Sequence, residues 1–485
     1  MKTRYLFYAV FLLALFLTAC TDGNLYTNVI PKDASIVASV NLQQMAEKGE
    51  LTGEDGKAFA EILGKSTKGE LNEKEMEIFN NVLTNPKESG LDLQKNVYLF
   101  ATPKIEYSGL LFAVSDVDKF AILSGLLVSQ NVCEPFIEEN GCHFSNVDNK
   151  TLVMYNDNVF LTVFSEKSST PDKLREVAFS WIANSEENSY VITDEFKVMS
   201  KSKADIAIAG SLDCLPEEQA QIFRIAMPKG IDLKDMAGVF AMNFEKGKLQ
   251  VDIETIFKSD AAKELAKQQQ KIYDGNLKGK FLDKFLDNSI MYLGFTCNGK
   301  EAYSVLMENE ILKSQIDEAG LPFDFQKVIE SLDGEIAMAL AIGKPIPQIA
   351  LYAEVDNDDI IDELDDYKKA LDLVQMKYGV EDGVLYLSNM VKPESGKSLE
   401  DKDWSNDSKG KLTYFTMDFS ILADIMKQLS GSSQAQQVGL VAEYLKSMTM
   451  YNDDVTHSHI VFNATDADTN VLKQIVDFAK KTSGL

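Results

Sequence analysis

Histidine and tryptophan are scarce in this chain of 485 residues, which contains three histidines and two tryptophans. Histidine is the side chain best suited to acid–base catalysis at neutral pH, so this scarcity leaves few general bases. Trp181 and Trp404 are too few to predict an aromatic platform for carbohydrates, and Trp181 lies on the apolar stripe of a predicted helix. The histidine content of the sequence therefore gives no indication of an enzyme.

Complete nucleotide-binding and catalytic motifs are also missing. Gly64-Lys65-Ser66 and Gly396-Lys397-Ser398 end like phosphate-binding loops, but each lacks the earlier glycine that lets the backbone wrap a phosphate. The acidic stretch at Asp356 lacks glycine at the sixth position of a calcium loop, so helix capping is the better explanation of its aspartates. No nucleophile elbow or zinc-protease helix motif occurs. A glycosidase pair among the many carboxylates remains open, because no spacing singles one out.

Positive charge is in deficit, with 48 lysines and arginines against 75 aspartates and glutamates. Loss of Lys2 and Arg4 with an N-terminal signal would leave 46 basic residues and a net charge of −29. Such a chain repels phosphate backbones, so the sequence predicts no nucleic-acid partner. It would attract a basic partner or divalent cations, or the acidity simply keeps a tethered protein soluble.

Long apolar runs are confined to the N-terminus. Lys2 and Arg4 form a basic start, residues 5–16 are almost entirely apolar, and Leu17-Thr18-Ala19-Cys20 follows. The run is too short to span a membrane and is typical of a secretory signal. The final cysteine resembles the bacterial lipobox, which implies that residues 1–19 are removed and that Cys20 becomes a lipidated (palmitate-bearing) N-terminus. The alternative is an ordinary cleaved signal with an incidental cysteine.

Cysteine is also rare, with five in the chain. Export implies an oxidising compartment in which cysteines can pair. Cys133 and Cys142 are close in sequence and flank a proline and a glycine, so a local disulfide across a turn is one prediction. Spacing alone does not establish the approach that a disulfide requires, and unpaired thiols are the alternative. Cys214 and Cys297 lie in apolar surroundings and are predicted to be buried, inert thiols.

The chain contains two segments that resemble each other. A short strand, two strands around a proline loop, a helix, a hairpin, another strand and a closing hairpin with its helix recur in the same order. The corresponding segments are 33–37 and 287–291, 97–101 and 336–340, 109–116 and 349–356, the helices at 117–127 and 358–373, 151–164 and 374–387, 206–213 and 412–418, and 238–273 and 445–481. We therefore expect an internal duplication, with coincidence in a large mixed chain as the alternative.

The predicted fold class is α+β, with two tandem related copies that each form a mostly antiparallel sheet with helices on one face. Alternating apolar and polar residues at 249–254 predict a strand with one buried face. The predicted organisation is a signal peptide at 1–19, a lipid-anchored tether at 20–32, a first copy at 33–280 and a second copy at 281–485. The segment 392–411, rich in serine, aspartate, lysine and glycine, is predicted to be a solvated loop or a disordered insertion.

Two of the three histidines occur together, in His457-Ser458-His459. If this segment is a strand, both rings lie on one face with Asp453, and two imidazoles with a carboxylate form a candidate zinc or other transition-metal site. Incidental surface histidines are the alternative. His143 beside Cys142 does not predict a catalytic dyad, because neighbours in a strand point to opposite faces. The sequence predicts no cofactor.

The lipobox, the duplicated body and the opening Ile30-Pro31-Lys32-Asp33-Ala34-Ser35 together resemble a family of uncharacterised Bacteroidota lipoproteins, classed as a domain of unknown function. The resemblance spans nearly the whole mature chain. The family has no established activity and supplies no catalytic residues. In that phylum, surface-exported lipoproteins typically carry an acidic cluster after the lipid cysteine, whereas Thr21-Asp22-Gly23-Asn24 has one acid. This departure implies a periplasm-facing protein of the outer membrane.

The function expected from these features is a non-enzymatic binding or scaffolding role in the cell envelope. The expected partners are the membrane, through the lipid, and an envelope protein or glycan. Two alternatives stay open: a hydrolase of envelope glycans or peptides that uses a carboxylate site, and metal capture through His457 and His459.

Overall fold

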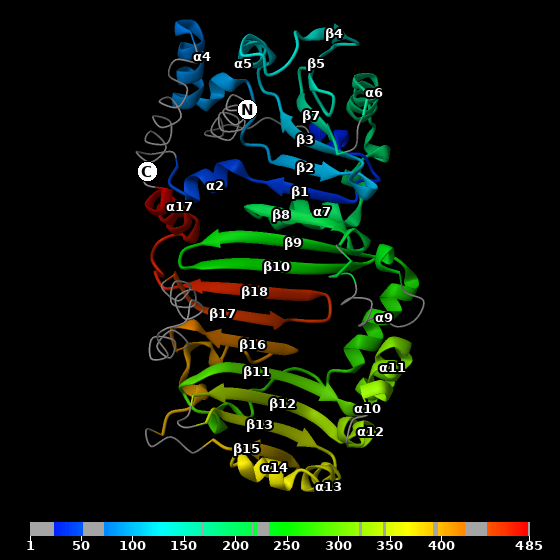
Figure 1. Ribbon diagram of the computed structural model, residues 1–485, viewed down its shortest axis with the longest axis vertical. Coiled ribbons are helices and arrows are strands. Elements are labelled where there is room, and N and C mark those ends of the chain that lie inside the picture. The colour runs from blue at the N-terminus through cyan, green and yellow to red at the C-terminus, as the bar shows by residue number, and fades with distance from the viewer. Residues whose placement is uncertain are drawn as a thin grey trace. The chain divides into compact units, whose positions relative to one another are not determined.

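The computed structural model describes residues 24–51, 72–166, 169–215, 217–218, 220, 232–319, 323–342, 346–390, 396–421 and 444–483 (Figure 1). Cys20 and the predicted signal peptide lie outside these residues. The chain divides into two compact units: Met1–Cys214, Gly238–Lys246 and Thr469–Leu485 form the first, and Leu215–Ala237 and Gly247–Asp468 form the second. These units are defined by compactness and the predicted copies by sequence likeness, so the copy boundaries stay a prediction.

The first unit contains an antiparallel sheet with the strand order β8–β1–β2–β3–β7–β6–β5–β4. β9 (Met236–Glu245) also lies almost entirely in this unit. The bounds of the sheet strands are β1 Ile36–Val40, β2 Val97–Ala101, β3 Tyr107–Ala113, β4 Ile137–Glu139, β5 Cys142–Asp148, β6 Thr151–Tyr155, β7 Val159–Ser165 and β8 Ile206–Ser211.

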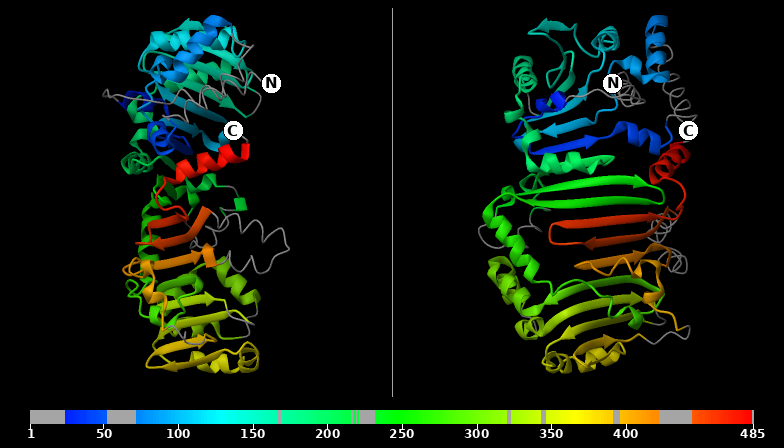
Figure 2. Two further views of the ribbon diagram at one scale, coloured as in Figure 1. Left: turned by 90° about the vertical axis from the view of Figure 1, so that its left-hand side faces the viewer. Right: turned by 180° about the vertical axis from the view of Figure 1, so that it is seen from behind.

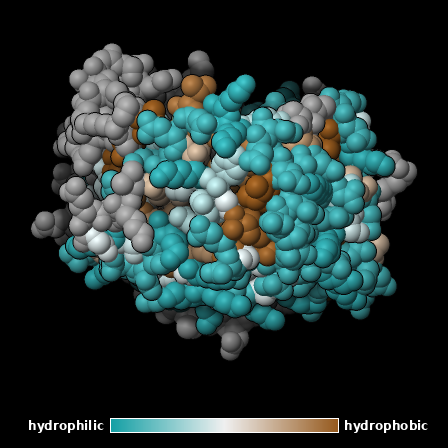
Figure 3. All heavy atoms as spheres, turned by 90° about the horizontal axis from the view of Figure 1, so that it is seen from below, coloured by the Kyte–Doolittle hydropathy of each residue, from teal (hydrophilic) through white to brown (hydrophobic). Residues whose placement is uncertain are grey.

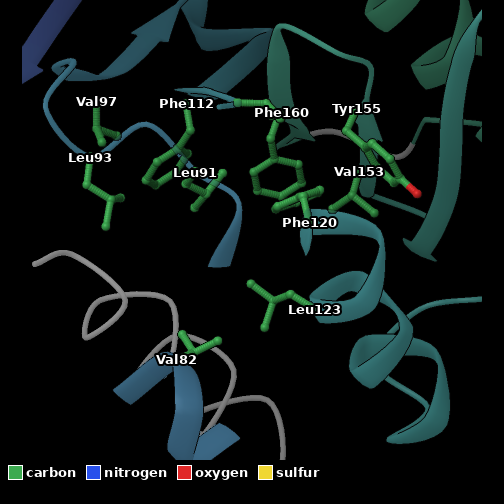
Figure 4. Close-up of a cluster of buried hydrophobic side chains, with 11 residues drawn as sticks. Val82, Leu91, Leu93, Val97, Phe112, Phe120, Leu123, Val153, Tyr155 and Phe160 are labelled. Atoms are coloured by element: carbon green, nitrogen blue, oxygen red, sulfur yellow. The ribbon is translucent and has the colours of Figure 1, made fainter. Parts of the chain in front are cut away.

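The helices of the first unit pack a core against this sheet. Their bounds are α2 Leu42–Lys48, α4 Glu73–Thr84, α5 Val117–Ser129, α6 Pro171–Ile182, α7 Asp194–Ser202 and α17 Val471–Ser483. Figure 4 shows Phe120 and Leu123 of α5 facing Phe160 and Tyr155 of the sheet. The ring of Phe120 lies 4.8 Å from that of Phe160 and 5.0 Å from that of Tyr155. Aromatic contacts of this kind stabilise a core beyond the area they bury.

Local signals explain where these helices begin. The side chain of Asp116 accepts a hydrogen bond from the Lys119 backbone and caps α5. Thr170 caps α6 in the same way, with Pro171 in the first turn. A short polar side chain before each helix satisfies the exposed N–H groups of the first turn, and a proline is well accommodated in that turn.

The second unit contains an antiparallel sheet with the strand order β10–β18–β17–β16–β11–β12–β13–β15–β14. Its strands are β10 Lys248–Phe257, β11 Ser289–Asn298, β12 Leu332–Ala341, β13 Gln348–Val355, β14 Lys377–Glu381, β15 Val384–Ser388, β16 Thr413–Asp418, β17 Leu445–Asn452 and β18 His457–Ala464. Pairing joins strands that are far apart in sequence, because β10 pairs with β18 from Lys248↔Asn463 to Glu254↔His457.

Helices gather at two places in the second unit (Figures 1 and 2). α9 to α12 lie beside one end of the strands, and α13 and α14 lie next to β15 in Figure 1. Their bounds are α9 Asp260–Lys271, α10 Gly299–Glu308, α11 Glu310–Ala319, α12 Phe325–Glu330, α13 Ile360–Asp365 and α14 Lys368–Leu373. Figure 3, seen from the end at which α13 and α14 are drawn, shows mostly hydrophilic residues around a small hydrophobic patch.

One face of the second sheet is covered by two irregular segments. The first carries Leu277, Phe281, Leu282 and Phe285, and the second carries Leu399 and Trp404; all pack on Tyr292, Ala337, Ala339, Ala350 and Tyr414 of the sheet. The second segment contains two 3-10 helices, Leu399–Asp401 and Asp403–Ser405. Leu399, Ser405 and Ser408 are buried, so residues 396–411 are not a disordered insertion, although most of the segment is exposed, as predicted for a solvated loop. Residues 392–395 lie outside the described residues.

The aspartates near residue 356 also differ from expectation. Asp359 precedes α13 without a side-chain capping bond, and Asn357 accepts the Asp359 N–H instead. The carboxylate of Asp356 lies 2.8 Å from Lys300 Nζ. An ion pair, rather than a cap, therefore engages Asp356. Among the described residues, no helix combines the length and apolarity needed to cross a membrane.

Candidate functional site

The predicted disulfide residues lie in the first unit, where both are buried. Cys133 follows α5 and packs with Leu127 and Val132, and Cys142 begins β5 with its Sγ 3.9 Å from Asn156 Nδ2. Both are free thiols in this structure. Burial raises the pKa of each thiol above its ordinary value, which makes them poor nucleophiles at neutral pH. A disulfide between them stays a prediction.

The predicted metal residues lie at one end of β17 and β18 in the second unit. His457 is half-exposed, and its Nδ1 lies 2.9 Å from Asp454 Oδ2 in the turn that precedes β18. His459 is more deeply placed: its Nδ1 lies 2.6 Å from Asp252 Oδ1 on β10, and its Nε2 lies 3.0 Å from Asp453 Oδ2. Both ring nitrogens of His459 thus face a carboxylate.

A lysine and a tyrosine complete this group, which we call the His459 cluster: His459, Asp252, Asp453, Lys411 and Tyr451. Lys411 Nζ lies 2.5 Å from Asp453 Oδ1 and 4.3 Å from the centroid of the Tyr451 ring. The Tyr451 ring stacks on the His459 ring at 4.6 Å and 19°. The Lys411 ammonium thus lies over the Tyr451 ring, and the carboxylates of Asp252 and Asp453 both have partners within the cluster.

This arrangement gives metal binding no geometric support. No group of three or more histidine, cysteine or acidic residues is placed to hold a metal ion within the part of the chain that the structure describes. A cation at His459 would have to displace Asp252 or Asp453 from a ring nitrogen. Metal capture through His457, His459 and Asp453 therefore stays a prediction.

The rings continue across the sheet from the His459 cluster. Tyr451 stacks on Tyr414 at 6.3 Å and 19°, and Tyr414 stacks on Trp404 at 5.6 Å and 22°. Trp404 also lies 5.3 Å from Tyr292. The strand register causes the first part of this row, because His459, Tyr451 and Tyr414 are successive cross-strand partners. Trp404, from the covering segment, is fixed against two buried tyrosines.

Beside Trp404 lies a cavity of about 410 Å³, here called the Trp404 cavity. It is lined from strands β11, β16, β17 and β18 and from the segment that carries Trp404. Its lining residues are Gly247, Ser289, Ile290, Met291, Tyr292, Leu399, Lys402, Asp403, Trp404, Asp407, Thr416, Asp418, Lys446, Ser447, Asn463, Ala464 and Ala467. The lining mixes an aromatic wall, aliphatic side chains, hydroxyl and amide groups, and charges of both signs.

Some polar groups of the cavity are engaged and others are available. Thr416 Oγ1 donates to the Met448 carbonyl, and Asp418 Oδ1 accepts the backbone N–H groups of Ser420 and Ile421. Asn463 Nδ2 donates to Ser447 Oγ at 3.0 Å. By contrast, Lys402 and Lys446 form no ion pair with any residue that the structure describes. These lysines can meet a ligand without first breaking a salt bridge.

We expect the turn before β18 to make the free energy of unfolding weakly sensitive to acid. Burial alone would raise the pKa of Asp454, but hydrogen bonds from Thr456 and His457 lower it to about 2. A carboxylate whose pKa is depressed in the folded state stabilises that state above its unfolded pKa of about 3.9 and loses the contribution as the pH falls toward 2. We expect Asp454→Asn to flatten the loss of stability over this window, by at most about 1 kcal/mol because the turn is half-exposed.

The measurement is urea unfolding between about pH 2 and pH 5. Asp274→Asn, at an exposed position of the same unit, is the control and should leave the pH profile unchanged. A profile of Asp454→Asn that matches the wild type would contradict the role assigned to this turn.

Sequence reasoning missed both the His459 cluster and the Trp404 cavity. It placed Asp453 with His459 but not Asp252, which comes from a strand 207 positions away. Trp404 lies in a segment of polar composition, and two tryptophans are too few to predict an aromatic site. The sequence holds one signal of the Trp404 site, which is a large apolar ring within a polar segment. Such a ring is expected to pack against a buried partner elsewhere in the fold.

Comparisons with known proteins add a family and little else. A search of curated proteins finds no match. Among solved structures, one titled "Structure of crystal form IV of TP0453" matches with 10% identity and a TM-score of 0.28, over 47% of this chain and 79% of that one. Crystal form III of TP0453 matches with 9% identity and a TM-score of 0.21, over 77% of this chain and 94% of that one. Likenesses this low support no argument about fold or function.

A family model covers nearly the whole chain, from residue 26 to residue 472. This span includes the strands of both sheets, the His459 cluster and the Trp404 cavity. The chain belongs to the family described as "Domain of unknown function (DUF4836)".

Proposed function

We propose that this chain is a non-enzymatic lipoprotein of the cell envelope that binds a ligand in the Trp404 cavity. The cavity itself carries the proposal, because it combines a fixed aromatic wall with polar groups from four strands. Small-molecule sites are usually concave, with volumes of a few hundred Å³ and a few convergent polar groups that orient the ligand. None of the described lining residues is a histidine. Asp403 and Asp407 are exposed, and the half-buried Asp418 already accepts the backbone N–H groups of Ser420 and Ile421. This leaves catalysis without an evident buried acid or base.

The location rests on the N-terminal sequence. The basic start, short apolar run and Leu17-Thr18-Ala19-Cys20 support cleavage before Cys20 and lipid attachment to it. Anchoring in the outer membrane, facing the periplasm, fits the single acid in residues 21–24. The family's lipoprotein character and its Bacteroidota origin are part of this proposal. The partners are then the membrane and an envelope protein or glycan.

Strand order supports the two-copy architecture of residues 33–280 and 281–485. In the first unit the order β8–β1–β2–β3–β7–β6 and in the second the order β16–β11–β12–β13–β15–β14 follow the same route along the chain. In each, the opening strand lies between the second strand and the strand that follows the hairpin. The last strands of the two copies, β10 and β18, pair with each other. A duplication accounts for this repetition of a non-trivial strand order.

The rival function is a hydrolase of envelope glycans or peptides. One observation favours it, because Asp403 and Asp407 lie at the same cavity as the unpaired lysines. Two carboxylates beside a sugar-sized site are the minimal equipment of a glycosidase.

The two tryptophans make the test of binding direct. The chain has two tryptophans, so Trp181→Phe leaves Trp404 as the only one. Trp181 is buried in the first unit and does not belong to the Trp404 cavity lining. We expect a saturable change in Trp404 emission when the low-mass fraction of a cell-envelope hydrolysate is added to this mature protein. The Trp404→Phe protein, which reports from Trp181 alone, is the control and should show no change. Unchanged Trp404 emission at saturating extract would overturn the proposed binding role.

A further inference from the structure

We infer that the Trp404 cavity takes a neutral saccharide. This inference rests on the proposed binding function and names its ligand class. Three features of the cavity lead to it: the charges of both signs in its lining, the aromatic wall, and the polar groups of neighbouring strands.

The charges of the cavity disfavour an ionic ligand. Asp403, Asp407 and Asp418 line it together with Lys402 and Lys446. An anion would meet three carboxylates and a cation would meet two ammonium groups, and like charges placed together cost free energy. A ligand with many hydroxyl groups avoids this cost, because each hydroxyl both donates and accepts a hydrogen bond. Such a ligand can donate to the carboxylates and accept from the lysines at the same time.

The aromatic wall favours a ring over a flexible chain. The Trp404 ring packs on the sheet with its centroid 5.6 Å from that of Tyr414 and 5.3 Å from that of Tyr292, and it remains half-buried beside the cavity. A side chain fixed in this way loses little conformational entropy when a ligand packs on it. The C–H face of a sugar is the apolar surface that fits such a wall, while its hydroxyl edge turns to the polar groups.

Neighbouring strands supply those polar groups at fixed spacing. Ser447 on β17 and Asn463 on β18 are adjacent cross-strand partners and share one hydrogen bond. That bond fixes the amide and leaves its oxygen and second N–H as hydrogen-bonding capacity for a ligand. Ile290, Met291 and Ala464 add apolar surface between these groups. A lining that contains both apolar and polar groups matches the C–H and O–H groups of a sugar.

The test uses the mature Trp181→Phe protein and follows Trp404 emission. The probes are N-acetylglucosamine, chitobiose, cellobiose and maltose as neutral saccharides, glucuronate and inorganic phosphate as anions, and the dipeptide alanylalanine as a zwitterion. We expect saturable binding of at least one neutral saccharide and none of the charged probes. Ala467→Leu narrows the cavity at an exposed lining position, so it should weaken binding by about tenfold or more. Lys409→Ala changes the segment that carries Trp404 but lies outside the cavity lining, so this variant should bind the saccharide as the Trp181→Phe parent does.

Each other outcome overturns a defined part of the inference. If only the anions or the dipeptide bind, the saccharide is wrong while a binding role for the cavity stands. Saccharide binding that Ala467→Leu leaves unchanged places the site elsewhere. If the envelope hydrolysate also leaves Trp404 emission unchanged, the binding role fails with the saccharide. Release of reducing sugar from chitobiose or cellobiose with time would instead establish the rival hydrolase.

Discussion

Glu335→Ala is expected to destabilise the second unit by about 3–5 kcal/mol. Glu335 lies on β12 and is 2% exposed, yet it carries a carboxylate. Its two oxygens accept the backbone N–H groups of Lys278 and Lys280, each at 2.8 Å. These bonds attach the covering segment that contributes Leu277, Phe281 and Phe285 to the core beside Trp404. Alanine would leave two N–H groups without an acceptor.

A second carboxylate supports the first. Glu354 Oε2 accepts the backbone N–H of Glu335, and Glu354 Oε1 lies 2.5 Å from Lys280 Nζ. Burial alone would raise the pKa of Glu354, but the Lys280 ammonium and the Glu335 N–H together lower it. Gly334 has φ +127°, and a Cβ there would lie 2.6 Å from Glu354 Oε2. The glycine therefore lets the Glu354 carboxylate reach the backbone that positions Glu335.

Urea unfolding of the Trp181→Phe protein measures this effect, because Trp404 then reports on the second unit alone. Glu335→Gln should fall between wild type and Glu335→Ala, since its amide oxygen can accept one N–H while its amino group faces the other. Asp333→Asn, at an exposed position two residues earlier on β12, is the matched control with an expected effect below about 0.5 kcal/mol. A loss of less than about 1 kcal/mol in Glu335→Ala would contradict the attachment role.

Local patterns in the sequence predicted most elements of the fold. The strand expected at 97–101 is β2, the helix expected from 117 is α5, and the hairpins expected at 151–164 and 374–387 are β6–β7 and β14–β15. These predictions succeed because period-two alternation, turn residues and capping side chains act over a few positions. The helix expected across 358–373 is instead two short helices, α13 and α14.

The candidate site could not be predicted in the same way, because its parts come together only through long-range pairing. Asp252 meets His459 because β10 pairs with β18, and the half-buried Trp404 packs against Tyr292 and Tyr414 from two different strands. Polar composition at 396–411 favours a loop, but composition does not show that Leu399 is 1% exposed against Phe285 and its neighbours. Tertiary packing overrides the local signal at the place where the cavity forms.

Cys20→Ser is expected to abolish lipid attachment completely. Each acyl CH₂ that enters a bilayer contributes about 0.8 kcal/mol, so membrane retention through Cys20 depends on its acyl groups. The measurement is incorporation of labelled palmitate in cells that express the full chain, with removal of residues 1–19 followed by mass. Wild type should carry the label and lose those residues, whereas Cys20→Ser should carry no label and keep them.

The structure supplies the matched control for this experiment. Cys133, Cys142 and Cys297 are buried, whereas Cys214 is exposed, so the prediction that Cys214 is buried is wrong. Cys214 is the described thiol most accessible to an acyl donor. Cys214→Ser should therefore be labelled as the wild type is. Loss of label in Cys214→Ser, or label that persists in Cys20→Ser, would remove the lipobox interpretation. An unlabelled wild type cut at another site would indicate an ordinary secretory signal, and the ligand of the Trp404 cavity would then have to be sought among soluble compounds instead of at the membrane.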